Sequence, residues 1–101
     1  MNRKEILKKE IEKNSSDPFN HYLLALEYQK ENNPEAEQIF NYINKTFSNY
    51  LPNYYTFGKY LIDREQEDYA KKILTEGIKL AQDLNNLKTE KELKQLLELY
   101  F

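Results

Sequence analysis

His21 is the only histidine of the chain, and imidazole is the side chain that most often acts as a base near neutral pH. That chemistry needs a carboxylate or a nucleophile held beside the ring. Asp17 lies four residues earlier, but it directly precedes Pro18 and is expected to cap a helix, which already uses its carboxylate. The chain has no cysteine, so thiol nucleophiles, disulfide bonds and cysteine-ligated metals are excluded. We therefore interpret His21 as a packed structural side chain and expect no catalytic residue.

Glutamates two residues apart recur along the chain and could suggest a metal site or an acid–base pair. These pairs are Glu35/Glu37, Glu65/Glu67 and Glu90/Glu92. Side chains two residues apart on a helix point about 200° away from each other, so the carboxylates of a pair do not converge. Each pair instead suits the first turn of a helix, where the helix dipole favours negative charge. Phosphate-binding glycine loops, paired-histidine motifs and nucleophile elbows are also missing, and we expect no metal, no cofactor and no enzymatic activity.

The composition predicts an all-α fold. The chain has 14 leucines but no valine, four threonines and only two glycines, Gly58 and Gly77. Strands favour β-branched residues and hairpins favour turn glycines, whereas leucine, glutamate and lysine favour helices. Apolar residues recur at steps of three and four, which is the period of a helix packed on one side. The expected helices cover residues 3–13, 18–31, 34–47, 52–64, 67–84 and 90–100.

Prolines mark three of the expected helix starts, because the first turn of a helix does not need the missing N–H. They are Pro18, Pro34 and Pro52. Asp17 and Asn33 precede the first two as N-caps, whereas Leu51 is a poor cap. The segment from Thr89 to Glu92 reads as a capping box that opens the last helix.

Two segments of the chain repeat at an interval of 33 or 34 residues. The first copy reads His21-x₂-Leu24-Ala25-x₂-Tyr28 and then Ala36-x₃-Phe40. The second copy reads Tyr54-x₂-Phe57-Gly58-x₂-Leu61 and then Ala70-x₃-Leu74. Small residues at fixed places in a recurring helix pair let the two backbones approach closely. In this order and at this period, the chain resembles a tetratricopeptide-repeat (TPR) protein.

The resemblance covers roughly residues 18–84 and departs from the family pattern in places. No tryptophan fills the first aromatic position, Pro52 matches the closing proline only loosely, and Gln82 stands where the second closing proline is expected. The resemblance implies one all-α domain over residues 1–101, a right-handed superhelical stack of antiparallel helix pairs. Residues 17–50 would form repeat 1 and residues 51–84 repeat 2, between capping helices at residues 1–16 and 85–101.

The resemblance also implies a concave groove lined by the first helix of each pair. By correspondence, the groove residues are Phe19, Tyr22, Leu26, Gln29, Tyr55, Thr56, Lys59, Ile62 and Asp63. Tyr22 and Tyr55 occupy equivalent places in the two copies, and rigid aromatic rings suit recognition of a partner. In the alternative interpretation the last helix covers these rings. Some TPR proteins hold the C-terminal carboxylate of a partner with lysine and asparagine side chains at set groove positions. The corresponding positions of this chain are Tyr22, Leu26 and Thr56, so the resemblance implies an apolar or aromatic protein segment as the ligand.

Charge and hydropathy limit the classes of partner. The net charge of −2 argues against nucleic acid, and no apolar run reaches the length of about 18 residues that a membrane span needs. The charged start lacks the apolar core of a signal peptide, which favours a cytoplasmic location, and the basic side of residues 3–13 is expected to be solvated. The predicted function is a non-enzymatic protein-interaction module or scaffold. The alternative is a self-associating structural protein that buries the groove in a homodimer.

Overall fold

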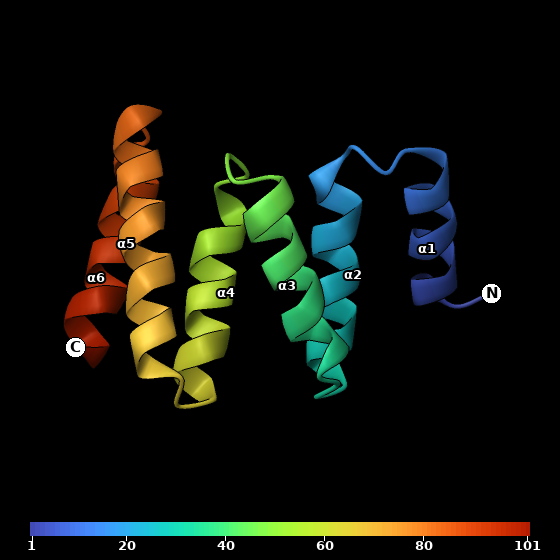
Figure 1. Ribbon diagram of the computed structural model, residues 1–101, viewed down its shortest axis with the longest axis horizontal. Coiled ribbons are helices and arrows are strands. Elements are labelled where there is room, and N and C mark those ends of the chain that lie inside the picture. The colour runs from blue at the N-terminus through green and yellow to red at the C-terminus, as the bar shows by residue number, and fades with distance from the viewer. The chain divides into compact units, whose positions relative to one another are not determined.

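A computed structural model describes all residues 1–101, and α-helix is the only regular secondary structure in it (Figure 1). The six helices are α1 (Arg3–Lys13), α2 (Pro18–Lys30), α3 (Glu35–Thr46), α4 (Pro52–Asp63), α5 (Glu67–Asp83) and α6 (Leu87–Tyr100). The first five agree with the expected helices to within one residue at each end. The predicted all-α fold with about six helices is thus confirmed.

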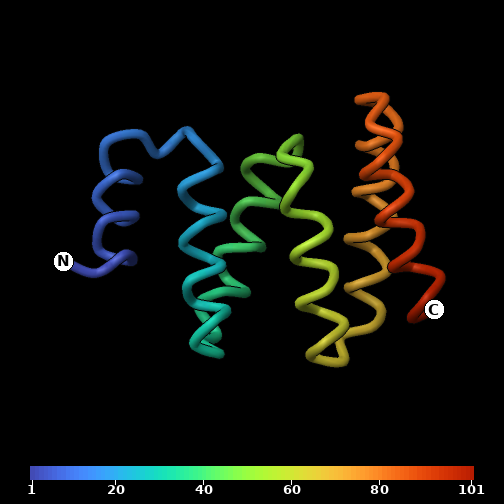
Figure 2. The backbone as a smooth tube through the Cα atoms, turned by 180° about the vertical axis from the view of Figure 1, so that it is seen from behind, coloured from blue at the N-terminus to red at the C-terminus, as the bar shows by residue number.

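The chain divides into two compact units, each of which has its own helix contacts. Unit 1 is Met1–Tyr50, in which α2 packs against α3 and α1 packs against α2. Unit 2 is Leu51–Phe101, in which α5 packs against both α4 and α6, and α4 also touches α6. Figure 2 shows the same antiparallel helix pairs from behind. The division falls between residues 50 and 51, where the sequence also divides one repeat from the next.

The helix starts follow the sequence signals, with one exception. The Asp17 carboxylate accepts a hydrogen bond from the Phe19 amide at 3.0 Å, and the Asn33 side chain accepts one from the Glu35 amide at 2.9 Å. As expected, Leu51 provides no side-chain cap for α4.

The predicted capping box at Thr89 is wrong, because α6 begins three residues before the expected residue 90. The Asn86 side chain accepts a hydrogen bond from the Thr89 amide at 3.0 Å, so Asn86 is the cap and Thr89 lies inside the first turn. Asparagine is a stronger N-cap than threonine, which explains why the helix starts at the earlier signal.

Three helices end in the same way, with a residue of positive φ but without glycine. Asn32, Glu65 and Asn85 have φ of 54°, 60° and 55° and follow α2, α4 and α5. After α4, the Gln66 amide bonds to the Leu61 carbonyl at 2.9 Å and the Glu65 amide to the Ile62 carbonyl at 2.9 Å, which is the Schellman arrangement. This explains how the chain makes its turns although neither glycine lies in one.

Replacing Glu65 with glycine is expected to raise the free energy of unfolding by about 0.5–1 kcal/mol, because glutamate has a steric penalty at positive φ. The midpoint of thermal unfolding followed by circular dichroism should then rise by about 2–8 °C. Glu67→Gly is the control, since Glu67 lies in the first turn of α5, and it should lower the midpoint. Equal midpoints for the two variants would contradict the assignment of strain to Glu65.

Small residues lie where the helices of each pair approach, as the repeat predicts. Ala25 and Ala36 are fully buried in unit 1, and Gly58 and Ala70 are buried in unit 2. A Cβ atom built at Gly58 would lie 2.5 Å from Cδ2 of Leu74, which is closer than side-chain carbons come. Contact this close across α4 and α5 offsets the cost of a glycine inside a helix.

Candidate functional site

His21 is a packed side chain, as the sequence suggested. Its ring lies 5.1 Å from the ring of Tyr42 and 5.7 Å from that of Phe47, measured between centroids. Its Nε2 atom lies 3.0 Å from the carbonyl oxygen of Ser15, within hydrogen-bond distance. Asp17 is occupied at the helix start by the Phe19 amide. The imidazole therefore joins α2 to α3 and to the segment before α2, and no nucleophile lies beside it among these contacts.

Most of the paired glutamates lie in first turns, as expected, but Glu65 lies in the turn before α5 and Glu92 lies in the second turn of α6. Glu90 accepts hydrogen bonds from Lys94 at 2.7 Å and from Gln82 at 3.2 Å. These contacts, that from Lys94 first, lower the pKa of the Glu90 carboxyl below its ordinary value. Nowhere in the structure do three or more histidine, cysteine, aspartate or glutamate side chains gather closely enough to hold a metal ion.

Four of the predicted groove residues lie on α2 in unit 1 and share one side of that helix. Phe19 is 51% exposed, while Tyr22, Leu26 and Gln29 are half-buried. The ring of Tyr22 meets the ring of Tyr50 edge to face, with 5.6 Å between centroids. Burial, with Tyr22 and Asp17 nearby, raises the pKa of the Tyr50 phenol.

Tyr50 was not among the predicted groove residues. It follows α3 outside any helical period, so only its place in the folded chain reveals its contact with Tyr22. This side of α2 thus presents an exposed phenylalanine beside a pair of packed tyrosines.

The other five predicted residues lie on α4 in unit 2. Lys59 and Asp63 are exposed, whereas Tyr55, Thr56 and Ile62 are half-buried. Tyr55 lines a hollow of about 200 Å³ together with residues of α6, namely Glu92, Gln95, Leu96 and Leu99. The last helix therefore forms a wall beside Tyr55 and leaves a hollow open between them.

The α6 residues of this hollow were not predicted by number, although one of the two interpretations of the sequence placed the last helix over the ring of Tyr55. The helical period does place Leu99 and Glu92 on one side of α6, but it does not show that this side faces Tyr55. Leu99 is 74% exposed and lines the hollow from the α6 side.

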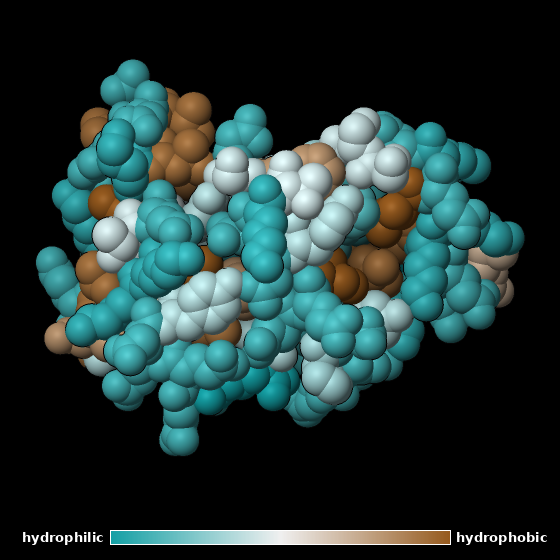
Figure 3. Space-filling view, viewed as in Figure 1, coloured by the Kyte–Doolittle hydropathy of each residue, from teal (hydrophilic) through white to brown (hydrophobic).

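A second and larger hollow, of about 800 Å³, opens between α5 and α6. It is lined by Lys71, Lys72, Thr75, Glu76, Leu97, Glu98 and Phe101. The Lys71 ammonium lies 5.4 Å from the centre of the Phe101 ring. Figure 3 shows further hydrophobic surface near the upper end of α5, where Leu84 and Leu87 are exposed. Unit 2 therefore carries apolar surface on both sides of α6.

Comparison with known proteins gives the family of the chain. No protein-family model matches it, and no curated protein sequence matches it. A crystal structure of a tetratricopeptide repeat domain protein from Salinibacter ruber is similar, with a TM-score of 0.73, 30% sequence identity and coverage of 80% of this chain and 91% of that chain. The solution NMR structure of a tetratricopeptide repeat domain protein from the same organism gives a TM-score of 0.76, 30% identity and coverage of 80% and 83%.

The chain belongs to the tetratricopeptide-repeat family. The predicted resemblance is confirmed, and so is the fold class of stacked antiparallel helix pairs. Helical repeats of this kind serve as protein-interaction modules, because stacked helix pairs present extended binding surfaces. None of the six helices is both long and apolar enough to cross a membrane.

Proposed function

We propose that this chain is a non-enzymatic interaction module that binds an apolar or aromatic segment of a protein, with candidate contact residues on α4 in unit 2 and on α2 in unit 1. The observation that carries the proposal is the hollow beside Tyr55, where an aromatic ring and the exposed Leu99 flank open space on rigid helices. Aromatic side chains supply a large contact area with few rotamers to immobilise, which suits them to binding.

Charged groups at the same face limit the ligand. Lys59 and Asp63 are exposed on α4, and Glu92 lines the hollow from α6. A segment with apolar side chains for the hollow and one or two charges at its edge would match this surface. The hollow of about 200 Å³ has room for single side chains of a ligand rather than for a whole helix.

The experiment is to pan a random-peptide phage library against the full chain and to measure the affinity of the selected peptides. Apolar and aromatic sequences should be enriched. The double variant Tyr22→Ala/Tyr55→Ala should bind them at least about tenfold more weakly, as expected for residues that anchor an interface. Both side chains are half-buried, so the variant should still unfold cooperatively, with a loss of about 1–2 kcal/mol rather than the 3–5 expected for each fully buried aromatic.

Tyr100→Ala is the matched control, because Tyr100 is an exposed tyrosine outside the predicted groove. It should leave peptide affinity unchanged. Equal binding by the double variant and the wild type would place the ligand elsewhere, and a failure of the library to yield any ligand would count against the module. Light scattering on the same samples tests the homodimer alternative, in which the wild type is a dimer and the double variant a monomer.

A further inference from the structure

Helix α1 depends on contacts with α2 although it buries little apolar surface. Only Leu7 of its eleven residues is buried. An isolated helix of this length is marginal in water, so its contacts with α2 must hold it in place. Both backbone views show α1 beside α2 and joined to it by a short connection (Figures 1 and 2).

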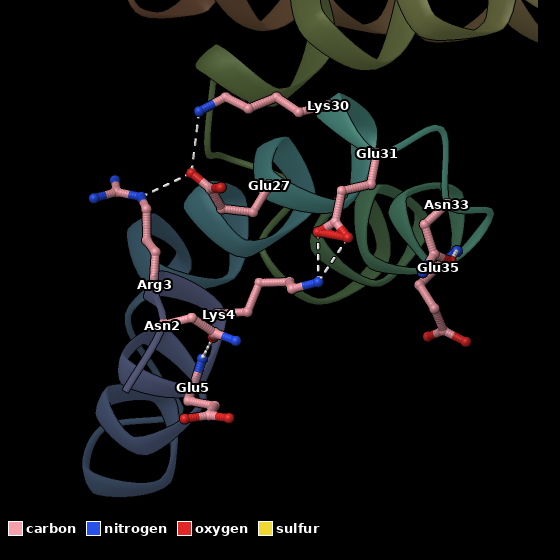
Figure 4. Close-up of polar contacts among 9 residues, drawn as sticks. All are labelled: Asn2, Arg3, Lys4, Glu5, Glu27, Lys30, Glu31, Asn33 and Glu35. Carbon is pink, nitrogen blue, oxygen red and sulfur yellow. Dashed lines mark hydrogen bonds and ion pairs between the residues drawn. The ribbon is translucent and has the colours of Figure 1, made fainter.

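Ionic and cation–π contacts make up much of that attachment. Arg3 Nε lies 2.8 Å from Glu27 Oε1, and Lys4 donates to Glu31 Oε2 at 2.7 Å. Figure 4 shows Arg3 and Lys30 pointing at Glu27 while Lys4 points at Glu31. The hydrogen bond from Lys30 first, with the charge of Arg3 as a smaller cause, lowers the pKa of Glu27.

An aromatic ring lies between the two acidic side chains along α2. The ammonium groups of Lys4 and Lys8 lie 5.2 Å and 5.8 Å from the centre of the Tyr28 ring. Glu27, Tyr28 and Glu31 thus form one face, which we call the acidic face of α2. The expectation that the basic side of α1 is solvated holds for the exposed Arg3 and Lys8 and fails for Lys4, whose side chain is only 27% exposed against the acidic face.

Contacts of this type are weak and sensitive to salt. Exposed ion pairs contribute little to stability, and salt at physiological concentration screens them. The α2–α3 pair has a core of its own, since Ala25, Ala36, Phe40 and Ile43 are fully buried. Helix α1 can therefore leave α2 by local opening while the rest of unit 1 stays folded.

We propose that the acidic face of α2 is a second binding surface, whose ligand is a basic amphipathic helix of a partner protein and whose occupant in the free chain is α1. Charge complementarity supports this occupant. The face presents two carboxylates one helical turn apart beside an aromatic ring, and α1 places an Arg-Lys pair and a second lysine one turn later against it. Lys30 of α2 pairs with Glu27 as well, but Glu31 receives its cation from α1.

This surface is independent of the proposed groove. At about 100° per residue, Tyr22 lies about 180° around α2 from Glu31 and about 120° from Tyr28. A ligand on the acidic face therefore leaves the groove residues free, and the two proposals fail or succeed separately.

The test uses the full chain and a fluorescent synthetic peptide of residues 1–16 as the basic helix, followed by fluorescence anisotropy. In the wild type the tethered α1 competes at a high effective concentration, so the peptide should bind weakly. Leu7→Asp, which removes the buried anchor of α1, should bind the peptide at least about tenfold more tightly. Adding Glu27→Gln/Glu31→Gln should reverse that gain by about tenfold or more.

Glu65→Gln/Glu67→Gln in the Leu7→Asp background is the matched control, because it removes the same charge from exposed positions in unit 2. Equal affinities for the two double-glutamine variants would overturn the proposal, as would absence of peptide binding to Leu7→Asp. A wild-type dimer that dissociates when residues 1–16 are removed would assign the surface to a second copy and overturn the proposed partner.

Hydrogen exchange in the wild type keeps the proposal testable if Leu7→Asp does not fold. Raising NaCl from about 0.05 M to about 0.5 M shortens the Debye length from about 14 Å to about 4 Å. Amides of α1 should then exchange at least about fivefold faster, while those at the core of α2 and α3 stay unchanged. Protection of α1 that equals that of α2 and does not change with salt would show that α1 is a fixed part of the core.

Discussion

Gly58→Leu should lower the free energy of unfolding by about 3 kcal/mol or more, because the site has no room even for a methyl group. A Cβ atom there would lie 2.5 Å from Cδ2 and 2.9 Å from Cγ of Leu74, whose side chain is fully buried. The larger side chain must force α4 away from α5 and so open the core of unit 2. Chemical denaturation followed by circular dichroism measures the loss.

Lys59→Leu is the matched control, because Lys59 is the next residue of the same helix and is exposed. It should shift the midpoint very little. Alanine substitutions sharpen the test, since Gly58 faces the end of a leucine side chain, which can rotate, whereas a Cβ at Gly77 would lie 2.6 Å from Cβ of Tyr54, next to the backbone. Gly77→Ala should therefore cost more than Gly58→Ala. Similar midpoints for Gly58→Leu and Lys59→Leu would mean that the helices of the pair are not in close contact here.

The helices could be predicted because their signals are local. Apolar residues at steps of three and four, together with Pro18 and Pro52, define α2 and α4 without knowledge of any neighbour. The start of α6 could not be chosen in this way, since Asn86 and Thr89 both signal a helix start and their competition depends on the folded ends of α5 and α6. The positive φ of Glu65 could not be predicted from the sequence either, because glutamate rarely takes that conformation.

Some features of the candidate sites follow from the local sequence, and others depend on contacts between helices. The resemblance to tetratricopeptide repeats assigned Phe19 and Tyr22 to the proposed groove, and the period of α2 places both on one side of that helix. The neighbours of these residues could not be derived in this way. That Leu99 lies beside the hollow of Tyr55, and that Glu27 lies opposite Arg3, depends on how one helix is placed against another. A single sequence does not reveal which side chains of different helices lie together. For this reason the acidic face of α2 was not predicted.

Deletion of residues 88–101 should abolish cooperative unfolding of unit 2 and cause aggregation, because it removes nearly all of α6. Leu93 of α6 is fully buried and lies where a Cβ at Gly77 would meet its Cδ1 atom at 3.1 Å, so α6 covers the side of α5 that carries Gly77. The deletion exposes this apolar side of α5 to water. Helical-repeat proteins need a terminal cap with a polar outer face to remain in solution. Light scattering and thermal unfolding of the purified protein measure both effects.

A pair of single substitutions separates loss of the cap from loss of chain length. Leu93→Ala should cost about 2–5 kcal/mol, the range for a buried leucine, because it opens a cavity between α6 and α5. Leu99 lies on the same helix but is 74% exposed, so Leu99→Ala should change the free energy of unfolding by about 0.5 kcal/mol or less. If the truncated chain stays monomeric with an unchanged transition, or if the two alanine variants unfold at the same midpoint, α6 is an appendage. The exposed Leu99 would then also lose its role as a wall of the binding hollow, since a helix that does not pack on α5 cannot hold that side chain beside Tyr55.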